Sequence, residues 1–408
     1  MSRSVDSART RSVLKYYVYK ATTAVEFYRP VMYLYFYSSG LSFVQIALLE
    51  AIYNVTTVLG EVPTGYLGDR VGRRNSLLLG TTLITFTLVG LGLAASFPAF
   101  AVLYACWSLG YAFRSGTEDA WVYETLGDAA SEGAFTHVRG RGQSVALVVG
   151  VGASLLGGYL GAVNLAYPFF VAAAVTALGV AVLLTLSDPD EYASRQTLGV
   201  RESLRITREV LSRPTLRAFV VYYYVLFSAV SYLVFIFLQP VFESVVSDYA
   251  LPFRVETLLG GFYALSNLLS AAVSYRLERI REVVGVRRWF LALPFVVGGG
   301  LATASVTPAL LVPVLFLTRV VVEPTRSLAG QYVNDRIETL GRATVLSAMA
   351  MAGGLTVIPF QLAGGAVSDA ASPSLALALA GGVLVVGSAL VLLWESPLRT
   401  PAESTTEA

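Results

Sequence analysis

The chain has 408 residues, of which 55% are hydrophobic and only 14% are charged, with a formal net charge of +2. A soluble globular protein carries roughly 25% charged residues, so this balance excludes an ordinary soluble domain and indicates a membrane protein. The basic residues lie in short connections, which excludes a nucleic-acid-binding face. A single cysteine, Cys106, excludes a disulfide framework and a cysteine metal site within the chain.

Apolar stretches of the length that a membrane-crossing helix needs, about 20 residues, recur along the whole chain. The basic start, "MSRSVDSARTRSVLKYYVYK", lacks the short uncharged core of a cleaved signal, so we expect a cytoplasmic tail that leads into a first helix. Hydropathy predicts twelve spans near 13–38, 42–68, 76–96, 98–125, 142–163, 165–186, 216–240, 256–275, 289–306, 308–333, 343–367 and 373–394.

The connections between the spans alternate in charge. On one side only Arg254 is found, whereas the connections on the other side contain many arginines. Because positive residues stay in the cytoplasm during insertion, both termini are predicted to lie inside a multi-pass cell-membrane protein. The arginine-rich connections lie near residues 70–74, 139–141, 195–217, 276–288 and 336–342.

The longest polar segment divides the predicted spans six and six. This predicts an N-terminal six-helix bundle at 1–186, a cytoplasmic linker at 187–215 and a C-terminal bundle with a short tail at 216–408. The linker reads equally well as an amphipathic surface helix or as a solvated segment. Arg114 with Glu118 recurs as Arg319 with Glu323 at an offset of 205 residues, and the pair Gly157 and Gly158 recurs as Gly364 and Gly365 at an offset of 207, which favours a duplicated six-helix unit.

The connection between spans two and three, "GYLGDRVGRRN", holds four charges and three glycines in eleven residues. Its arginines anchor the topology, which is one sufficient reading. Its glycines allow a sharp turn and a close approach of two helices, and its aspartate can pair with the arginines or with a helix N-terminus. Anchoring alone does not require the aspartate and the glycines.

The longer stretch "GYLGDRVGRRNSLLL" resembles the signature loop of the major facilitator superfamily. The resemblance implies an all-α membrane protein with twelve helices in two pseudo-symmetric six-helix bundles. It also implies a secondary transporter that works by alternating access, with no cofactor and no metal. The matching residues are Gly65, Gly68, Asp69, Arg70, Gly72, Arg73 and Arg74.

In the resembled family this loop is a cytoplasmic gate, in which the aspartate and an arginine link to an acidic residue at the inner end of the fourth span. Here that partner would be Glu124 or, as the alternative, Asp128. The corresponding loop of the second half, "YRLERIREVVGVRRW", keeps the basic residues and leaves the acidic position open between Glu278 and Glu282. The fifth span, "VVGVGASLLGGYLGA", resembles the signature of drug and proton antiporters without its Gly-Pro step, and small residues for helix packing explain it as well.

Ionisable residues inside predicted spans are costly to insert and therefore indicate function. The spacing of three or four within each pair predicts shared helical faces, either as ion pairs with a structural role or as parts of a cavity. The resemblance implies that spans one, four, seven and ten line the central cavity. The candidate cavity residues are Glu26, Arg29, Arg114, Glu118, Asp119, Arg319 and Glu323.

A carboxylate in a medium of low dielectric can titrate near neutrality, as proton coupling requires. Glu26, Glu118, Asp119 and Glu323 are the candidates for carrying a proton, and Glu26 and Asp119 come first. Asp119 has no basic residue three or four positions away in its own helix. Tyrosines in spans one and seven favour an aromatic cavity for an amphipathic organic solute.

The sequence thus predicts proton-coupled efflux of an amphipathic compound by a transporter that acts as a monomer in the bilayer. Its expected partners are a small-molecule substrate and protons. Proton-coupled uptake of a metabolite and a nontransporting receptor of the same fold are the alternatives. An intramembrane enzyme would need clustered nucleophiles or metal ligands, which one histidine and one cysteine do not supply.

Overall fold

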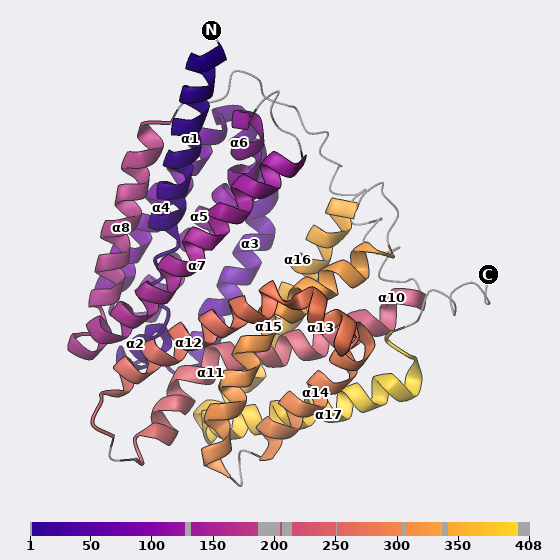
Figure 1. Ribbon diagram of the computed structural model, residues 1–408. Coiled ribbons are helices and arrows are strands. Elements are labelled where there is room, and N and C mark those ends of the chain that lie inside the picture. Colours follow the sequence, from indigo (N-terminus) through magenta and orange to yellow (C-terminus); the bar gives the residue numbers. More distant parts are fainter. Residues whose placement is uncertain are drawn as a thin grey trace. The chain divides into compact units, whose positions relative to one another are not determined.

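The computed structural model of the chain is built from helices and contains no strand in the residues that it describes (Figure 1). These are residues 2–126, 132–186, 205, 214–249, 251–303, 307–336 and 342–398. The predicted all-α class is therefore confirmed for this part of the chain. The predicted linker at 187–215 lies almost wholly outside the described residues.

Eight helices of the described part are long and apolar enough to cross a membrane, or nine if the bent pair α13 (Leu277–Val283) and α14 (Val286–Thr303) forms one span. The sequence predicts twelve. Two of the remaining three are each divided into two helices, because the first span is broken between α1 and α2 and the fourth between α5 and α6. The third corresponds to α16, a helix of 29 residues whose side chains are described only in part.

The contacts within the chain divide it into two compact units. Unit 1 comprises Met1–Leu41, Ile52–Gln196 and Pro252–Asn267, and unit 2 comprises Ser42–Ala51, Thr197–Leu251 and Leu268–Ala408. The helices α3 and α12 each contribute to both units. The predicted boundaries at 186 and 216 stay a prediction.

Unit 1 places α4 against α5 and α8, and α1 against α7 and α8, so that these helices run side by side (Figure 1). In unit 2, α14 packs against α15 and α17, and α11 packs against α16 and α17. The two patterns correspond helix by helix, as expected for a duplicated six-helix unit. The helices of unit 1 are α1 (Ser2–Thr23), α2 (Met32–Ser38), most of α3 (Phe43–Val71), α4 (Arg73–Leu93), α5 (Phe97–Arg114), α6 (Thr117–Leu126), α7 (Glu132–Val163), α8 (Tyr167–Leu184) and the first part of α12 (Val255–Tyr275).

The span Leu216–Val246 of unit 2 contains an irregular segment. Between α10 and α11 the backbone forms a π-helical segment, η2, which has a wider turn than an α-helix. The helical elements that lie wholly in unit 2 are α10 (Pro214–Phe219), η2 (Val220–Phe227), α11 (Ser228–Val246), α13, α14, η3 (Pro308–Leu310), α15 (Leu311–Asn334), α16 (Arg342–Ala370) and α17 (Pro373–Trp394).

The repeated glycine pairs mark equivalent close contacts of helix backbones. A Cβ on Gly158 of α7 would lie 2.5 Å from the carbonyl oxygen of Glu256 and 2.7 Å from the Cα of Gly260, both on α12. A Cβ on Gly365 of α16 would lie 2.9 Å from the Val44 Cα on α3. Only a residue without a side chain permits these distances, so both pairs serve helix packing.

Candidate functional site

The site in unit 1 lies where two predicted spans are interrupted. The helix α1 ends at Thr23 and α2 begins at Met32, while α5 ends at Arg114 and α6 begins at Thr117. The second break is made by Gly116, whose φ of +70° is a left-handed conformation that favours glycine. Discontinuous helices expose backbone and helix ends to a binding site within a membrane protein.

These breaks correct the expectation that the charged pairs share helical faces. Glu26 and Arg29 lie in the break between α1 and α2, and Arg114 and Glu118 lie on opposite sides of the break at Gly116. Both pairs nevertheless form. The Nε and Nη2 atoms of Arg29 donate to the two carboxylate oxygens of Glu26 at 2.7 and 3.0 Å, and Arg114 Nη2 donates to Glu118 Oε1 at 2.9 Å.

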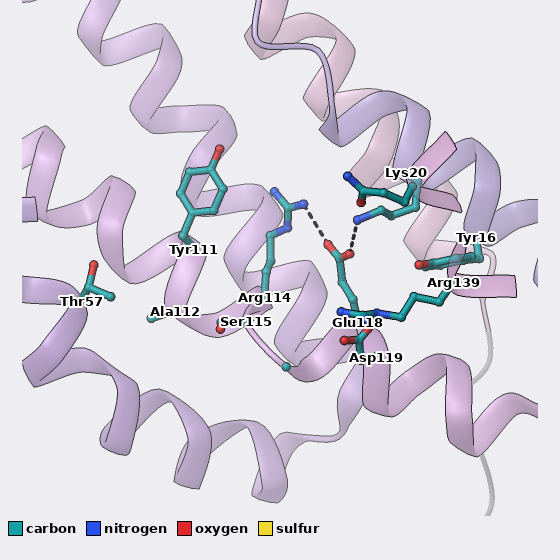
Figure 2. Close-up of a pocket in the computed structure, with 12 residues that line it drawn as sticks. Tyr16, Lys20, Thr57, Tyr111, Ala112, Arg114, Ser115, Glu118, Asp119 and Arg139 are labelled. Carbon is teal, nitrogen blue, oxygen red and sulfur yellow. Dashed lines mark hydrogen bonds and ion pairs between the residues drawn. The ribbon is translucent and has the colours of Figure 1, made fainter. Parts of the chain in front are cut away.

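A cavity of about 410 Å³ opens at this site (Figure 2). Its lining contains Lys20 of α1, Arg114 at the end of α5, Glu118 and Asp119 in the first turn of α6, and Arg139 of α7. The N-terminal end of α6 stabilises carboxylates in its first turn, because the free N–H groups there carry partial positive charge. Uncharged polar side chains and Tyr111 complete the wall.

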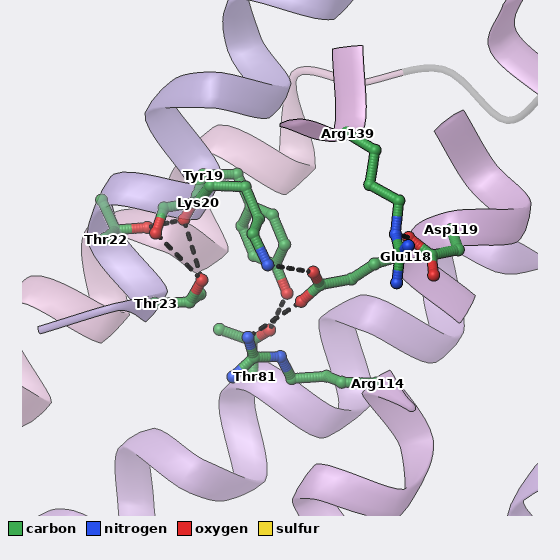
Figure 3. Close-up of polar contacts among 9 residues, drawn as sticks. All are labelled: Tyr19, Lys20, Thr22, Thr23, Thr81, Arg114, Glu118, Asp119 and Arg139. Carbon is green, nitrogen blue, oxygen red and sulfur yellow. Dashed lines mark hydrogen bonds and ion pairs between the residues drawn. The ribbon is translucent and has the colours of Figure 1, made fainter. Parts of the chain in front are cut away.

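Glu118 is the centre of the charged cluster and pairs with two cations (Figure 3). Lys20 Nζ lies 2.7 Å from Glu118 Oε2, and Arg114 Nη2 lies 2.9 Å from Glu118 Oε1. The three side chains are 19%, 10% and 15% exposed for lysine, arginine and glutamate. The Arg114 guanidinium also lies 5.7 and 5.6 Å from the ring centroids of Tyr19 and Tyr111, in range for cation–π attraction.

Asp119, which the sequence singles out as a carboxylate without a cation on its own helix, has a cation on another helix. Arg139 Nε lies 3.0 Å from Asp119 Oδ1, and the two side chains are 61% and 44% exposed. The sequence places Arg139 in a loop before a span that starts at 142, whereas α7 already begins at Glu132 and carries Arg139. The early start of this helix explains the unexpected pair.

The candidates in the tenth span lie in unit 2, on α15, and do not line this cavity. Glu323 forms an ion pair with Arg326 at 3.2 Å, and these side chains are 60% and 70% exposed. The sequence paired Glu323 with Arg319, which lies four residues earlier on the same helix. A spacing of three residues also places two side chains on one helical face, and Glu323 pairs with Arg326 at that spacing.

The signature motif forms the junction of α3 and α4, and its charges lie on helix ends where a loop was expected. The junction is Gly72 alone, whose φ of +92° reverses the chain between Val71 and Arg73. Gly68 also fits a close approach, since a Cβ there would lie 3.0 Å from Ser76 Oγ. Gly65 does not, because a Cβ there would meet nothing within 4 Å.

The arginines of the motif contact two neighbouring helices. Arg73 Nε lies 3.2 Å from Glu124 Oε1 on α6, and these side chains are 11% and 7% exposed. Arg74 donates to the carbonyl oxygens of Leu183 and Leu184 at 3.0 and 2.9 Å, at the C-terminal end of α8, where the helix dipole favours a cation. The guanidinium of Arg70 lies 5.0 Å from the Tyr66 ring centroid.

Glu124 is thus one of the two acidic residues that the sequence offered as a partner of the motif. The other, Asp128, and the side chain of Asp69 lie outside the described residues. The gating role of this group stays a prediction.

Sequence reasoning missed three polar contacts that join distant helices. The first joins Lys20 of α1 to Glu118 of α6. Lys20 lies inside the predicted first span, so the rule that selected the other intramembrane charges would also have selected it. Tyr232 of α11 donates to Glu50 of α3 at 2.7 Å, and Glu50 is 5% exposed. Asp369 accepts hydrogen bonds from the backbone N–H groups of Phe43 and Val44 at 2.7 and 3.0 Å, which caps the N-terminus of α3.

Comparison with known proteins assigns this architecture to a family. The sequence model of the Major Facilitator Superfamily matches residues 21–359. The chain is 31% identical over 114 residues to an uncharacterised MFS-type transporter of Methanocaldococcus jannaschii, covering 28% of this chain and 27% of that protein. It is 24% identical over 146 residues to the uncharacterised MFS-type transporter YxaM of Bacillus subtilis, covering 36% of each. These matches thus span about a quarter and about a third of the two relatives.

Solved structures share the fold over nearly the whole chain. The nucleoside transporter NupG superposes with a TM-score of 0.77 at 14% identity, over 94% of this chain and 98% of that one. A bacterial homologue of the human lysosomal transporter Spinster, in an inward-facing and unoccupied conformation, gives a TM-score of 0.70 at 17% identity, over 94% and 96%. These similarities concern the fold alone. The corresponding helix contacts in the two units, the motif at the junction of α3 and α4 and the match of the family model lead to one conclusion: the chain belongs to the Major Facilitator Superfamily and is an integral multi-pass membrane protein.

Proposed function

We propose that the protein is a proton-coupled secondary transporter that exports a small amphipathic organic compound through the cavity of unit 1. It acts as a monomer in the cell membrane, with both termini in the cytoplasm. The observation that carries the proposal is the cavity itself, which combines charged side chains with tyrosine rings at the break between α5 and α6. Its volume of about 410 Å³ lies within the range of sites for small organic molecules.

An aromatic cluster continues from the cavity wall into unit 1 and supports an amphipathic substrate. The Tyr111 ring lies 6.2 Å from Trp107 and 6.4 Å from Tyr53, and Trp107 lies 5.4 Å from Tyr104 and 5.3 Å from Tyr28. Such rings contact an apolar body closely and offer hydroxyl or indole N–H groups to its polar part. The charged cluster then faces the polar end of the solute.

The proton pathway is assigned to the carboxylates next to this cluster. Glu26 accepts a long hydrogen bond, 3.4 Å, from the Tyr111 hydroxyl, so a change in its charge reaches the cavity wall directly. Its own cation is Arg29, and release of that pair on protonation provides a change that a transporter can couple to movement. The buried pair of Arg73 and Glu124 is the candidate latch on the side that we expect to face the cytoplasm.

Proton-coupled uptake of a metabolite is the second candidate, because NupG, a nucleoside transporter, has the same fold. The direction of a proton gradient separates the two. In everted vesicles, an acid interior drives accumulation of a compound that is normally exported in exchange for protons. The same gradient drives release of a compound that is normally taken up together with protons.

The test therefore measures movement of radiolabelled aromatic compounds into everted membrane vesicles from cells that produce the protein, with vesicles from cells that lack it subtracted to remove simple pH partitioning. Accumulation with an acid interior is the expected result, and Glu26→Gln should remove its dependence on the gradient. Movement in the opposite direction favours uptake. Binding without movement would make the protein a receptor and refute the proposal.

A further inference from the structure

The charges that line the cavity do not balance. Three cations, Lys20, Arg114 and Arg139, face two carboxylates, Glu118 and Asp119. The pair of Arg139 and Asp119 is internally neutral and largely solvated. Glu118 alone is therefore left to compensate both Lys20 and Arg114, and one positive charge remains without a counter-charge among the described lining residues.

This excess charge lies in a poorly hydrated place. The side chains of Lys20 and Arg114 are 19% and 10% exposed. The carboxylate of Glu26, which touches the cavity wall through Tyr111, is already engaged with Arg29 in a bidentate pair. An uncompensated buried cation is costly in low dielectric, and a bound anion would offset that cost.

Arg114 also has unused capacity for hydrogen bonding. Its Nε is buried and has no hydrogen-bond partner within the part of the chain that the structure describes. A guanidinium presents Nε and one Nη along a single edge, which matches the two oxygens of a carboxylate or phosphate group. Here the Nη2 atom donates to Glu118 while Nε donates to nothing described, so this edge is only half used.

We propose that the cavity binds an oxyanion, a carboxylate or phosphate group of the transported solute, between Lys20 and Arg114. The inference rests on the proposed function and names the chemical class of its substrate. Glu118 is the internal competitor of this group: it holds the two cations in the empty site, and the incoming oxyanion shares or replaces its contacts. The ring of Tyr111 lies beside the same guanidinium and contacts the apolar part of the solute.

Other charge classes fit the site less well. A cationic group would have to displace both Lys20 and Arg114 from Glu118 and would add to the excess positive charge. A neutral group would leave that excess unchanged. Only an anion improves the charge balance of the cavity, which decides among the three classes.

The experiment compares four aromatic probes that differ in one substituent: benzoate, phenyl phosphate, benzamide and benzylammonium. Binding to the purified full-length protein in nanodiscs is measured at constant ionic strength from the concentration dependence of thermal stabilisation. We expect the oxyanions to bind at least about tenfold more tightly than benzamide, with benzylammonium weakest. Comparison of benzoate with phenyl phosphate identifies which oxyanion the cavity prefers.

Substitutions of Lys20 and of Glu118 should change the affinity for benzoate in opposite directions, which a merely structural role of these residues would not produce. Lys20→Gln should weaken benzoate binding by about tenfold, and Lys20→Arg should largely retain it. Glu118→Gln should strengthen benzoate binding, because it removes the competing carboxylate. Arg279→Gln, which changes a cation that is 77% exposed on α13, is the control for general surface charge and should leave binding unchanged. Thermal unfolding curves recorded in the absence of any probe identify the variants that are folded.

Two results would overturn the inference. One is binding of benzamide or benzylammonium as tight as that of benzoate. The other is a loss of benzoate binding in a folded Glu118→Gln protein that matches the loss in Lys20→Gln. Because binding is measured without a gradient, an oxyanion preference without flux would refute transport and leave this site intact, whereas flux of aromatic solutes without that preference would refute this inference alone.

Discussion

The contact of Gly158 with α12 gives the sharpest stability prediction. In Gly158→Ala the new Cβ would lie 2.5 Å from the Glu256 carbonyl oxygen and 2.7 and 2.9 Å from backbone atoms of Gly260. All three are backbone atoms, so the helices must separate by roughly 1 Å at this point, a gap that forfeits up to half of each dispersion contact. We expect a cost of about 2 kcal/mol from overpacking.

The matched control is Gly152→Ala on the same helix, where a Cβ meets nothing within 4 Å. Alanine is the better helix former, so this change should stabilise the protein by up to about 1 kcal/mol. The assay heats the solubilised protein and measures the folded fraction by size-exclusion chromatography. The unfolding temperature should fall for Gly158→Ala by roughly 1 °C per kcal/mol, because the entropy of unfolding grows with the length of the chain. A Gly158→Ala protein as stable as the Gly152→Ala control would refute the close-packing argument.

Three further predictions concern charge. Asp69→Asn should reduce the initial rate of transport without changing the amount of protein in the membrane, because the arginine anchors remain; unchanged transport would remove the gate assignment. Glu124→Gln removes the buried carboxylate that pairs with Arg73, 11% exposed, and should lower the free energy of unfolding by up to about 3–5 kcal/mol, which thermal unfolding measures. A smaller loss in the double variant that also carries Arg73→Met would show that breaking this ion pair is the cause. Glu26→Gln should abolish the response of flux to the pH gradient, with Asp119→Asn as the comparison, and an unchanged response in both would exclude these carboxylates as proton carriers.

The sequence predicted the features that depend on residues close together in the chain. Hydropathy located the helices, and the offset between Gly158 and Gly365 indicated the repeat, because equivalent helices need equivalent small residues. Spacing also identified the pair of Arg114 and Glu118. It placed both on one helix, however, since nothing in the pattern distinguishes the left-handed turn at Gly116 from a glycine inside a helix.

The missed contacts join residues that only tertiary packing brings together. Lys20 lies 98 positions from Glu118, and Tyr232 lies 182 positions from Glu50. Arg139 reaches Asp119 only because α7 begins ten residues before the apolar stretch that predicted it. Helical periodicity carries no information on such partners, so the second cation of Glu118, and with it the charge excess of the cavity, could be recognised only in three dimensions.

The π-helical segment η2 allows a change of helical register in the second half of the chain that a regular α-helix does not allow. A π turn holds about one residue more than an α turn, so its conversion to an α-helix would rotate the following residues by about 100° and advance them by about 1.5 Å. Tyr232 lies five residues after this segment, within α11. Such a register change would carry its hydroxyl away from Glu50 without a loop or a hinge, so that the backbone of one helix could make or break a buried hydrogen bond to another.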